Sequence, residues 1–372
     1  MDRASLFTEL GRIAPLSLAE DWDNVGLLVG ESAGEMTGPA LCTIDLTDEV
    51  MDEAERLGCS VIVSYHPPIF APMKRVVCSD TKQRLVHRAI RAGISVYSPH
   101  TAIDAAEDGL NDWLISGFGA GDVRSLKTHT GRSDLRKIVT YVPPADVERV
   151  RNALASSGAG HIGAYDLCSF SAPGTGTFRG DPTTNPTVGT PGELQNVAEV
   201  RLEMICPAGA AALAVEALQS FHPYEEPAID VIALEPMPSR HAGQGRRIVL
   251  DQPMTTSQIG DKLKAHLGIE RLKLAPPNGD HEKPITHIGV CAGAGAELAE
   301  VAAHNEVELF ITGEMRHHEV LAHLDRGLGL ILAGHTNTER GFLPVLAKRL
   351  RTNLPGLDIR VSEADHSPLA WV

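Results

Sequence analysis

Helical and strand-like patterns of hydrophobic residues alternate along the first third of the chain. Residues 48–57 place their apolar side chains on one helical face, and residues 60–65 follow as a β-branched run. The same order recurs from an apolar helical stripe at residues 85–90 to a strand-like run at residues 94–98. Strands that alternate with helices are typical of a mainly parallel sheet. The pattern therefore predicts an α/β fold.

The last third of the chain repeats this alternation. We expect three strands and two helices there, with the strands at residues 285–291, 308–312 and 329–333 and the helices at residues 296–304 and 314–325. Together the two regions predict an α/β core of two similar halves, residues 1–128 and residues 240–372. The halves share almost no sequence identity, so their similarity is predicted at the level of the fold alone.

The middle of the chain differs in composition and in the order of its elements. Residues 137–235 predict the order strand, helix, strand, strand, helix, strand, with a Gly-, Pro- and Thr-rich loop or ribbon at residues 171–192. This order suits a small ferredoxin-like α+β sandwich. The segment holds 5 basic and 12 acidic residues, so it supplies −7 of the chain's formal charge of −15. We therefore expect an inserted domain.

Charge and hydropathy exclude two classes of partner. Of the 372 residues, 48 are acidic and 33 are basic, so the chain lacks the positive surface that nucleic-acid binding requires. The longest apolar runs fall far short of the roughly 20 residues needed to cross a bilayer. The first residues also lack the basic start and apolar stretch of a secretory signal. We predict a cytoplasmic protein that binds neither membranes nor nucleic acid.

Polar side chains follow four of the predicted strands, at the edge where α/β sheets build their sites. They include His66, Asp104, His318, His335 and Glu339. The six cysteines show no C-x-x-C spacing, so a bound metal would be held by nitrogen and oxygen atoms. Imidazole and carboxylate are ligands that Zn, Mn and Fe(II) accept. Each histidine alone is more often a capping or hydrogen-bonding residue, but the four strand ends together indicate a metal site.

Motifs at these strand ends resemble those of the NIF-three-like dinuclear metal-centre proteins, which are also labelled GTP cyclohydrolase 1 type 2 homologues. They are SYHPPIF from Ser64, HTAIDAAEDGLND from His100, TGEMRHH from Thr312, GHTNTE from Gly334 and WDNVGL from Trp22. The resemblance covers most of both halves. The insert is similar to a domain related to CutA and PII signal proteins that longer members carry, and its clearest mark is HPYEEP at residues 222–227.

The resemblance implies a divalent-metal site between the two halves. Carried over position by position, it makes His66, Asp104, His335 and Glu339 ligands, with Glu339 bridging two ions. The family usually has two consecutive histidines where this chain has Tyr65 before His66. A phenol, with a pKa of about 10, is a poorer ligand at neutral pH than imidazole. We therefore expect one or two Zn, Mn or Fe ions per chain, and the number depends on whether Tyr65 is a ligand.

His318 matches a position of the family motif, which makes it the expected acid/base group or a residue that supports the ligands. The alternative is a histidine at the start of a helix that faces solvent. Two divalent ions balanced by Asp104 and Glu339 would leave a charge of about +2. An anionic small molecule such as a phosphate would compensate that charge, so we expect an anionic substrate.

The resemblance thus implies a metal-dependent hydrolase that acts on a nucleotide or another phosphorylated small molecule. It also implies a ring-shaped homohexamer whose openings are capped by the insert. Nothing in the residues indicates a guanine pocket, so GTP in the family label does not identify the substrate. The alternative is a non-catalytic metal-binding regulatory or scaffold protein whose insert senses a metabolite.

Overall fold

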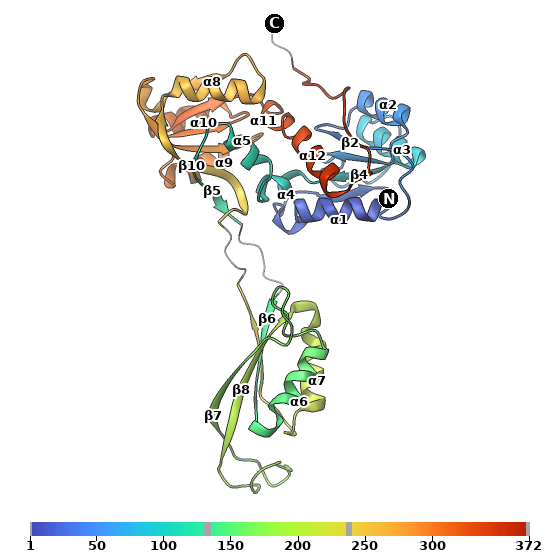
Figure 1. The fold of residues 1–372 in the computed structure, drawn as a ribbon, viewed down its shortest axis with the longest axis vertical. Helices are drawn as coiled ribbons and strands as arrows, with labels where there is room; N and C mark the ends of the chain where they lie inside the picture. Colours follow the sequence, from blue (N-terminus) through green and yellow to red (C-terminus); the bar gives the residue numbers. More distant parts are fainter. Residues whose placement is uncertain (1, 130–134, 236–239, 370–372) are drawn as a thin grey trace. The chain divides into compact units, whose positions relative to one another are not determined.

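The computed structural model of the chain describes residues 2–129, 135–235 and 240–369. The chain divides into two compact units (Figure 1), one of residues 1–129 with 239–372 and one of residues 130–238. The second unit encloses the segment predicted as an insert at residues 137–235. None of the helices among the described residues is both long and apolar enough to span a membrane.

The first unit contains a five-stranded sheet in the order β1-β4-β3-β2-β15. Its strands are β1 (Gly26–Val29), β2 (Ala40–Thr43), β3 (Val61–Ser64), β4 (Ser95–Ser98) and β15 (Ile359–Val361). Only β1 runs antiparallel to its neighbour, and the other pairs are parallel. The mainly parallel sheet predicted for this part of the chain is therefore present.

Helices cover both faces of this sheet. On one face α2 (Asp48–Leu57) and α3 (Thr81–Ala92) share a core with the strands, and on the other face α1 (Arg3–Ile13) and α12 (Leu343–Asn353) do so. The ends of α2 follow from its sequence, because the Thr47 side chain accepts a hydrogen bond from the Val50 amide and Gly58 closes the helix with a φ of 63°.

A six-stranded sheet forms the other side of the first unit, in the order β11-β14-β13-β12-β10-β5. The strands are β5 (Gly121–Thr128), β10 (Gly243–Met254), β11 (Lys273–Ala275), β12 (Ile285–Cys291), β13 (Leu309–Thr312) and β14 (Gly329–Leu332). The helices that belong to it are α8 (Thr256–Leu267), α9 (Ala296–His304) and α10 (His317–Asp325). Only β12, β13 and β14 are mutually parallel. The helix α10 begins three residues later than predicted, so Glu314 lies in a loop.

The two halves of the core exchange edge strands. β5 comes from the N-terminal half and pairs with β10 in the six-stranded sheet. β15 comes from the C-terminal half and pairs with β2 in the five-stranded sheet. One hydrophobic cluster contains residues of both sheets. The halves therefore form a single unit with a shared core.

A buried arginine connects the sheets through the short helices between them. α4 (His100–Ala105), α5 (Leu110–Ser116) and α11 (Asn337–Arg340) lie between the two sheets (Figure 1). Arg246 of β10 is fully buried. It donates two hydrogen bonds to Asp112 of α5, at 2.7 and 2.9 Å, and one to the Ala106 carbonyl after α4, at 2.7 Å. Arg246 therefore fixes the helices that carry part of the predicted site.

The second unit is a four-stranded antiparallel sheet in the order β7-β8-β6-β9. Its elements are β6 (Leu135–Val142), α6 (Val147–Ser156), β7 (Ser169–Phe178), β8 (Gln195–Pro207), α7 (Ala211–Phe221) and β9 (Ile229–Ala233). This is the predicted ferredoxin-like order of elements. α6 and α7 pack on one face of the sheet. The segment predicted as a loop or ribbon is a ribbon of β7 and β8 with a connecting tip.

Replacing Arg246 by methionine should reduce the free energy of unfolding of the first unit by about 3–5 kcal/mol, because Asp112 and the carbonyls would lose their buried partner. Urea unfolding followed by tryptophan fluorescence measures this loss. All three tryptophans, Trp22, Trp113 and Trp371, lie outside residues 130–238, so the signal reports on the first unit alone.

Arg326→Met is the matched control for this experiment. Arg326 pairs with Glu300 at 3.2 Å, but both side chains are more than half exposed. Exposed pairs contribute at most about 1 kcal/mol. Equal losses in the two variants would contradict a bridging role for Arg246.

Candidate metal centre

The carboxyl ends of both parallel strand sets converge on one region of the first unit. From the five-stranded sheet, β2 leads to Asp45 and β3 leads to His66. From the six-stranded sheet, β13 leads to Glu314 and β14 leads to His335. An ion pair between His66 and Glu339 joins side chains from the two sheets here. Strand ends are where open α/β sheets place their sites, and here two sheets contribute to one site.

Three of the predicted ligands lie together at these strand ends. The Nε2 atom of His66 is 3.6 Å from Oε2 of Glu339, and the Nε2 atom of His335 is 3.3 Å from Oε1 of the same carboxylate. One ligand atom from each residue lies within 4.8 Å of the other two. Within residues 2–129, 135–235 and 240–369, no other group of three or more His, Cys, Asp or Glu residues meets this spacing.

Carboxylates behind the two imidazoles fix their orientation. Nδ1 of His66 lies 2.9 Å from Oδ1 of Asp45, and Nδ1 of His335 lies 2.9 Å from Oε1 of Glu314. In metal sites, a carboxylate commonly holds one ring nitrogen of a histidine while the other nitrogen binds the ion. Asp45 and Glu314 were not among the predicted site residues. Asp45 follows a strand, as the predicted ligands do, and Glu314 lies in the TGEMRHH motif.

Glu339 has the environment expected of an anionic metal ligand. The residue is 1% exposed, and its Oε2 atom has no hydrogen-bond partner. A buried carboxylate oxygen without a partner is costly, so a cation at this point would stabilise it. Gly293 leaves the space beside the carboxylate, since a Cβ atom at that position would lie 2.7 Å from Oε1. The nitrogen and oxygen donors and the free carboxylate oxygen therefore fit a divalent cation.

Tyr65 and Asp104 form a separate pair next to this group. The phenol donates a 2.8 Å hydrogen bond to Oδ1 of Asp104. Burial and the carboxylates of Asp104 and Glu339 raise the pKa of Tyr65 well above its ordinary value. Burial also raises the pKa of Asp104 to about 7, although His100 and the Tyr65 hydroxyl act in the opposite direction. Tyr65 is thus held as a neutral phenol, and Asp104 lies outside the three-residue group.

The electrostatics of His66 favour a bound positive charge. Burial alone would lower its pKa, but the carboxylates of Asp45 and Glu339 more than offset burial and raise the pKa to about 10. The hydrogen bond from His66 in turn lowers the pKa of Asp45, against the effect of burial. Without a metal, the site therefore holds a proton at neutral pH where a cation would otherwise lie.

Aromatic rings extend from the ligands to the protein surface. The ring centroids of His66 and His100 are 5.5 Å apart, and those of His100 and Trp22 are 6.2 Å apart. Trp22 is 59% exposed and lies 5.9 Å from the ring of Phe70, which is 48% exposed. Asp23 fixes His100 through its Nδ1 atom at 2.8 Å. The candidate metal centre therefore has an exposed aromatic pair at its rim.

Comparison with known proteins identifies the family. The sequence model of Duf34/NIF3 (NGG1p interacting factor 3) matches residues 1–368. The chain is 34% identical to human NIF3-like protein 1 over 382 residues, which cover 100% of this chain and 93% of that protein. It is also 34% identical over 367 residues to the GTP cyclohydrolase 1 type 2 homolog of Mycobacterium tuberculosis, covering 96% of this chain and 94% of that protein. The chain belongs to the NIF3 family.

Solved structures of NIF3 relatives share the fold. Staphylococcus aureus protein SA1388 has a TM-score of 0.82 at 26% identity, and a Bacillus cereus protein related to NIF3 has a TM-score of 0.73 at 29% identity. Each comparison covers 100% of this chain and 99% of the other. The family resemblance predicted from the motifs is therefore confirmed along the whole chain.

His318 does not belong to the group of three ligand-type residues. It is the second residue of α10, is exposed, and makes no hydrogen bond or ion pair within the part of the chain that the structure describes. In this NIF3 family member, an acid/base role for His318 therefore stays a prediction. The same holds for Asp104 and Tyr65 as metal ligands.

Metal binding by this NIF3 family member should become tighter as the pH rises. Because the pKa of metal-free His66 is about 10, its imidazole is protonated at neutral pH and must lose that proton to bind an ion. We expect the apparent affinity to rise by up to about tenfold per pH unit between pH 6 and 8, with release of about one proton per ion. Calorimetric titration with Zn²⁺ in buffers of different ionisation enthalpy measures both quantities.

Asp45→Asn is the informative variant for this titration. It keeps a hydrogen-bonding group behind His66 but removes one of the two carboxylates that raise the imidazole pKa. The variant should release fewer protons per ion than the wild type. An affinity that does not change with pH in the wild type would contradict the protonated state of His66.

Proposed function

We propose that this NIF3 family member is a divalent-metal-dependent hydrolase that acts on a nucleotide or another phosphorylated small molecule. The observation that carries the proposal is the group of His66, His335 and Glu339, with its buried carboxylate oxygen that accepts no hydrogen bond. The name GTP cyclohydrolase 1 type 2 homolog, given to several relatives, supports a nucleotide as the substrate class.

The residues around the site would have two different roles, binding the ion and orienting its ligands. His66, His335 and Glu339 would hold the ion, and Asp45 and Glu314 keep each Nε2 atom directed toward Glu339. The ion would supply a Lewis acid that polarises a phosphoryl or carbonyl oxygen and lowers the pKa of water to about 7. Donor atoms of this kind suit Zn, Mn and Fe(II).

A second ion per chain would need Asp104. In the proposal Asp104 and Glu339 would hold it, with Tyr65 as a hydrogen-bond donor or as a ligand. The phenol donates to Oδ1 of Asp104, which leaves Oδ2 for an ion, but a ligand role for Tyr65 itself requires the phenol to lose its proton. We therefore propose one ion in the three-residue group and a weaker position beside Asp104.

The aromatic rim supports a substrate with a flat ring. Trp22 and Phe70 expose apolar rings next to His100, which borders His66. Stacking of a base on an aromatic side chain contributes about 1–3 kcal/mol in nucleic-acid complexes. A nucleotide could place its base there and direct its phosphate, an anion, toward the ion.

His318 is proposed as the acid/base group, since an exposed imidazole at the same sheet edge is accessible to substrate.

Three further features are proposed from the family resemblance. They are a homohexameric assembly, a CutA/PII-like character of the insert, and a cytoplasmic location. The ferredoxin-like order β6-α6-β7-β8-α7-β9 supports the CutA/PII-like character of the insert.

The alternative function is a non-catalytic metal-binding regulatory or scaffold protein. One observation favours it, a ligand-sized cavity in the second unit.

Metal-dependent turnover tests the proposed function. With Mn²⁺ or Zn²⁺ supplied, a panel of nucleotides, phosphomonoesters and heterocyclic nucleosides should contain at least one that is hydrolysed. His318→Ala should lower kcat by about 100-fold or more, the usual loss for an acid/base group, without changing metal content. His317→Ala, the adjacent exposed histidine, is the matched control and should keep wild-type kcat.

Two outcomes would count against parts of this proposal. A metal-loaded protein that hydrolyses nothing in the panel would overturn the hydrolase and leave the regulatory alternative. Equal activity of the His318→Ala and His317→Ala variants would overturn the role of His318 while leaving the hydrolase intact.

A further inference from the structure

The second unit contains a cavity that the metal-centre chemistry does not use. Its volume is about 330 Å³, which lies within the range of sites for small organic ligands. Its wall is formed by β6, by the ends of β7 and β8, by the ribbon tip and by the HPYEEP motif at residues 222–227. The most distinctive motif of the insert therefore lines a cavity.

Hydrogen bonds connect the ribbon tip to this motif and keep the cavity wall in place. The backbone amide of Asn185 donates to Oε2 of Glu225 at 3.1 Å, and the Thr187 hydroxyl donates to the Pro223 carbonyl at 2.7 Å. His222 is buried, accepts a hydrogen bond from the Tyr224 amide at Nδ1, and lies 3.1 Å from the Tyr141 carbonyl at Nε2. The cavity is thus built from elements that are bound to one another.

The cavity wall combines aromatic rings with an excess of carboxylates. The rings are those of Tyr141, Phe178 and Tyr224, and the charged lining residues are Glu199, Glu225, Glu226 and Arg179. Three carboxylates and one guanidinium give a formal charge of −2. The whole predicted insert is also acidic, with 5 basic and 12 acidic residues between 137 and 235. An anionic ligand would meet repulsion here, whereas a cation would be attracted.

Glu199 is the least exposed of the three lining carboxylates, half-buried where Glu225 and Glu226 are exposed, and Tyr224 holds it in place. Its Oε1 atom accepts a 2.8 Å hydrogen bond from the Tyr224 hydroxyl. Burial and the Glu199 carboxylate together raise the pKa of Tyr224, so the phenol remains a donor. A Cβ atom at Gly176 would collide with the Glu199 carboxylate, so only glycine leaves room for it. Within the described residues, no hydrogen bond reaches Oε2 of Glu199.

We propose that this cavity binds an organic cation, an alkylammonium compound whose charged nitrogen lies against Glu199 and between the rings of Phe178 and Tyr224. Carboxylates neutralise an ammonium group, and aromatic faces attract it through the cation–π interaction. The Phe178 and Tyr224 rings lie 6.5 Å apart between centroids. This site and its ligand are independent of the hydrolase proposed above, because all the lining residues belong to the second unit.

Spermidine is a suitable probe, because it is a flexible alkylammonium compound of a size that fits the cavity. Isothermal titration of the full-length protein at about 0.15 M salt, where surface charges are screened, measures its affinity. Glu199→Gln should weaken binding by about tenfold or more, since glutamine keeps the shape and can accept the Tyr224 hydrogen bond but lacks the charge. Gly176→Ala, which displaces the carboxylate, should weaken binding similarly.

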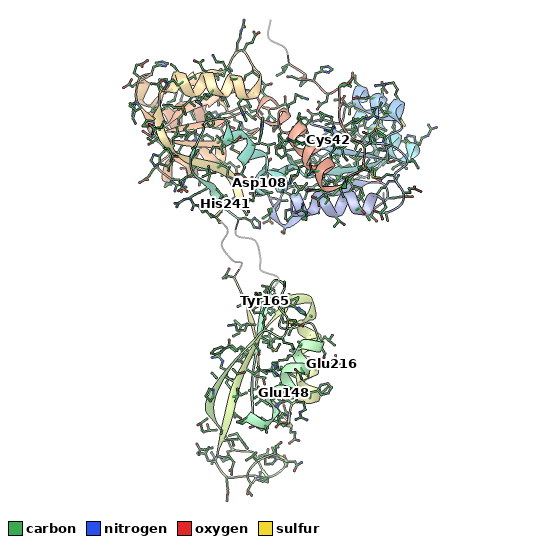
Figure 2. All side chains as sticks on the ribbon, in the orientation of Figure 1. Cys42, Asp108, Glu148, Tyr165, Glu216 and His241 are labelled. Atoms are coloured by element: carbon green, nitrogen blue, oxygen red, sulfur yellow. The ribbon has the colours of Figure 1, made fainter. Side chains whose placement is uncertain are left out.

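Glu216→Gln is the matched control. Glu216 lies on α7 (Figure 2), is exposed, and does not line the cavity, yet its replacement removes the same charge from the same unit. It should leave spermidine affinity unchanged. Circular dichroism of each variant shows whether the unit remains folded. Phe178→Leu provides a second variant that leaves every charge in place, and it should weaken binding by severalfold through the lost cation–π contact.

The other outcomes would overturn the proposal. If folded wild-type protein does not bind spermidine, the cavity is not an organic-cation site. Equal weakening by Glu199→Gln and Glu216→Gln would show non-specific attraction to an acidic surface. Binding of Mg²⁺ but not spermidine, lost in Glu199→Gln, would indicate an inorganic cation site. Binding of ATP that Glu199→Gln strengthens would indicate an anion site.

Discussion

A buried carboxylate between two imidazoles is the constraint on which the rest of the first unit depends. Glu339 is 1% exposed, and its Oε2 atom has no hydrogen-bond partner. Such a group is stable only where a positive charge compensates it. His66 supplies that charge as a proton in the metal-free protein, and a divalent cation could replace the proton. The same residues could therefore hold either a proton or a divalent cation at this point.

The exchange of strands between halves explains how distant residues reach this carboxylate. His66 follows a strand of the five-stranded sheet, whereas His335 and Glu339 follow a strand of the six-stranded sheet. β5 and β15 each pair with the sheet of the other half, and Arg246 binds the helices between the sheets. These connections hold the two strand edges together. The positions of the ligands relative to one another therefore depend on the shared core, and neither half alone would determine them.

Features with a local signature could be predicted from the sequence, and features that depend on distant partners could not. α2 was predictable because its apolar stripe and the glycine after it are adjacent in the chain. His66, His335 and Glu339 were predictable because they follow recognisable strands and lie in motifs that resemble those of the family. β15 was not, since three residues carry no pattern without their partner β2. Nothing near Asp45 or Glu314 in the sequence indicates which imidazole each would face, because that depends on how the strand ends are arranged in space.

The metal content of the purified protein tests the central claim most directly. Protein prepared without chelator should retain at least about one equivalent of Zn, Mn or Fe after dialysis, measured by elemental analysis. Glu339→Gln should lose that ion, and Glu270→Gln, which changes an exposed acid of the same unit, should keep it. Wild-type protein that holds no metal when any of these ions is supplied, or a Glu339→Gln variant that holds as much as the wild type, would contradict the account.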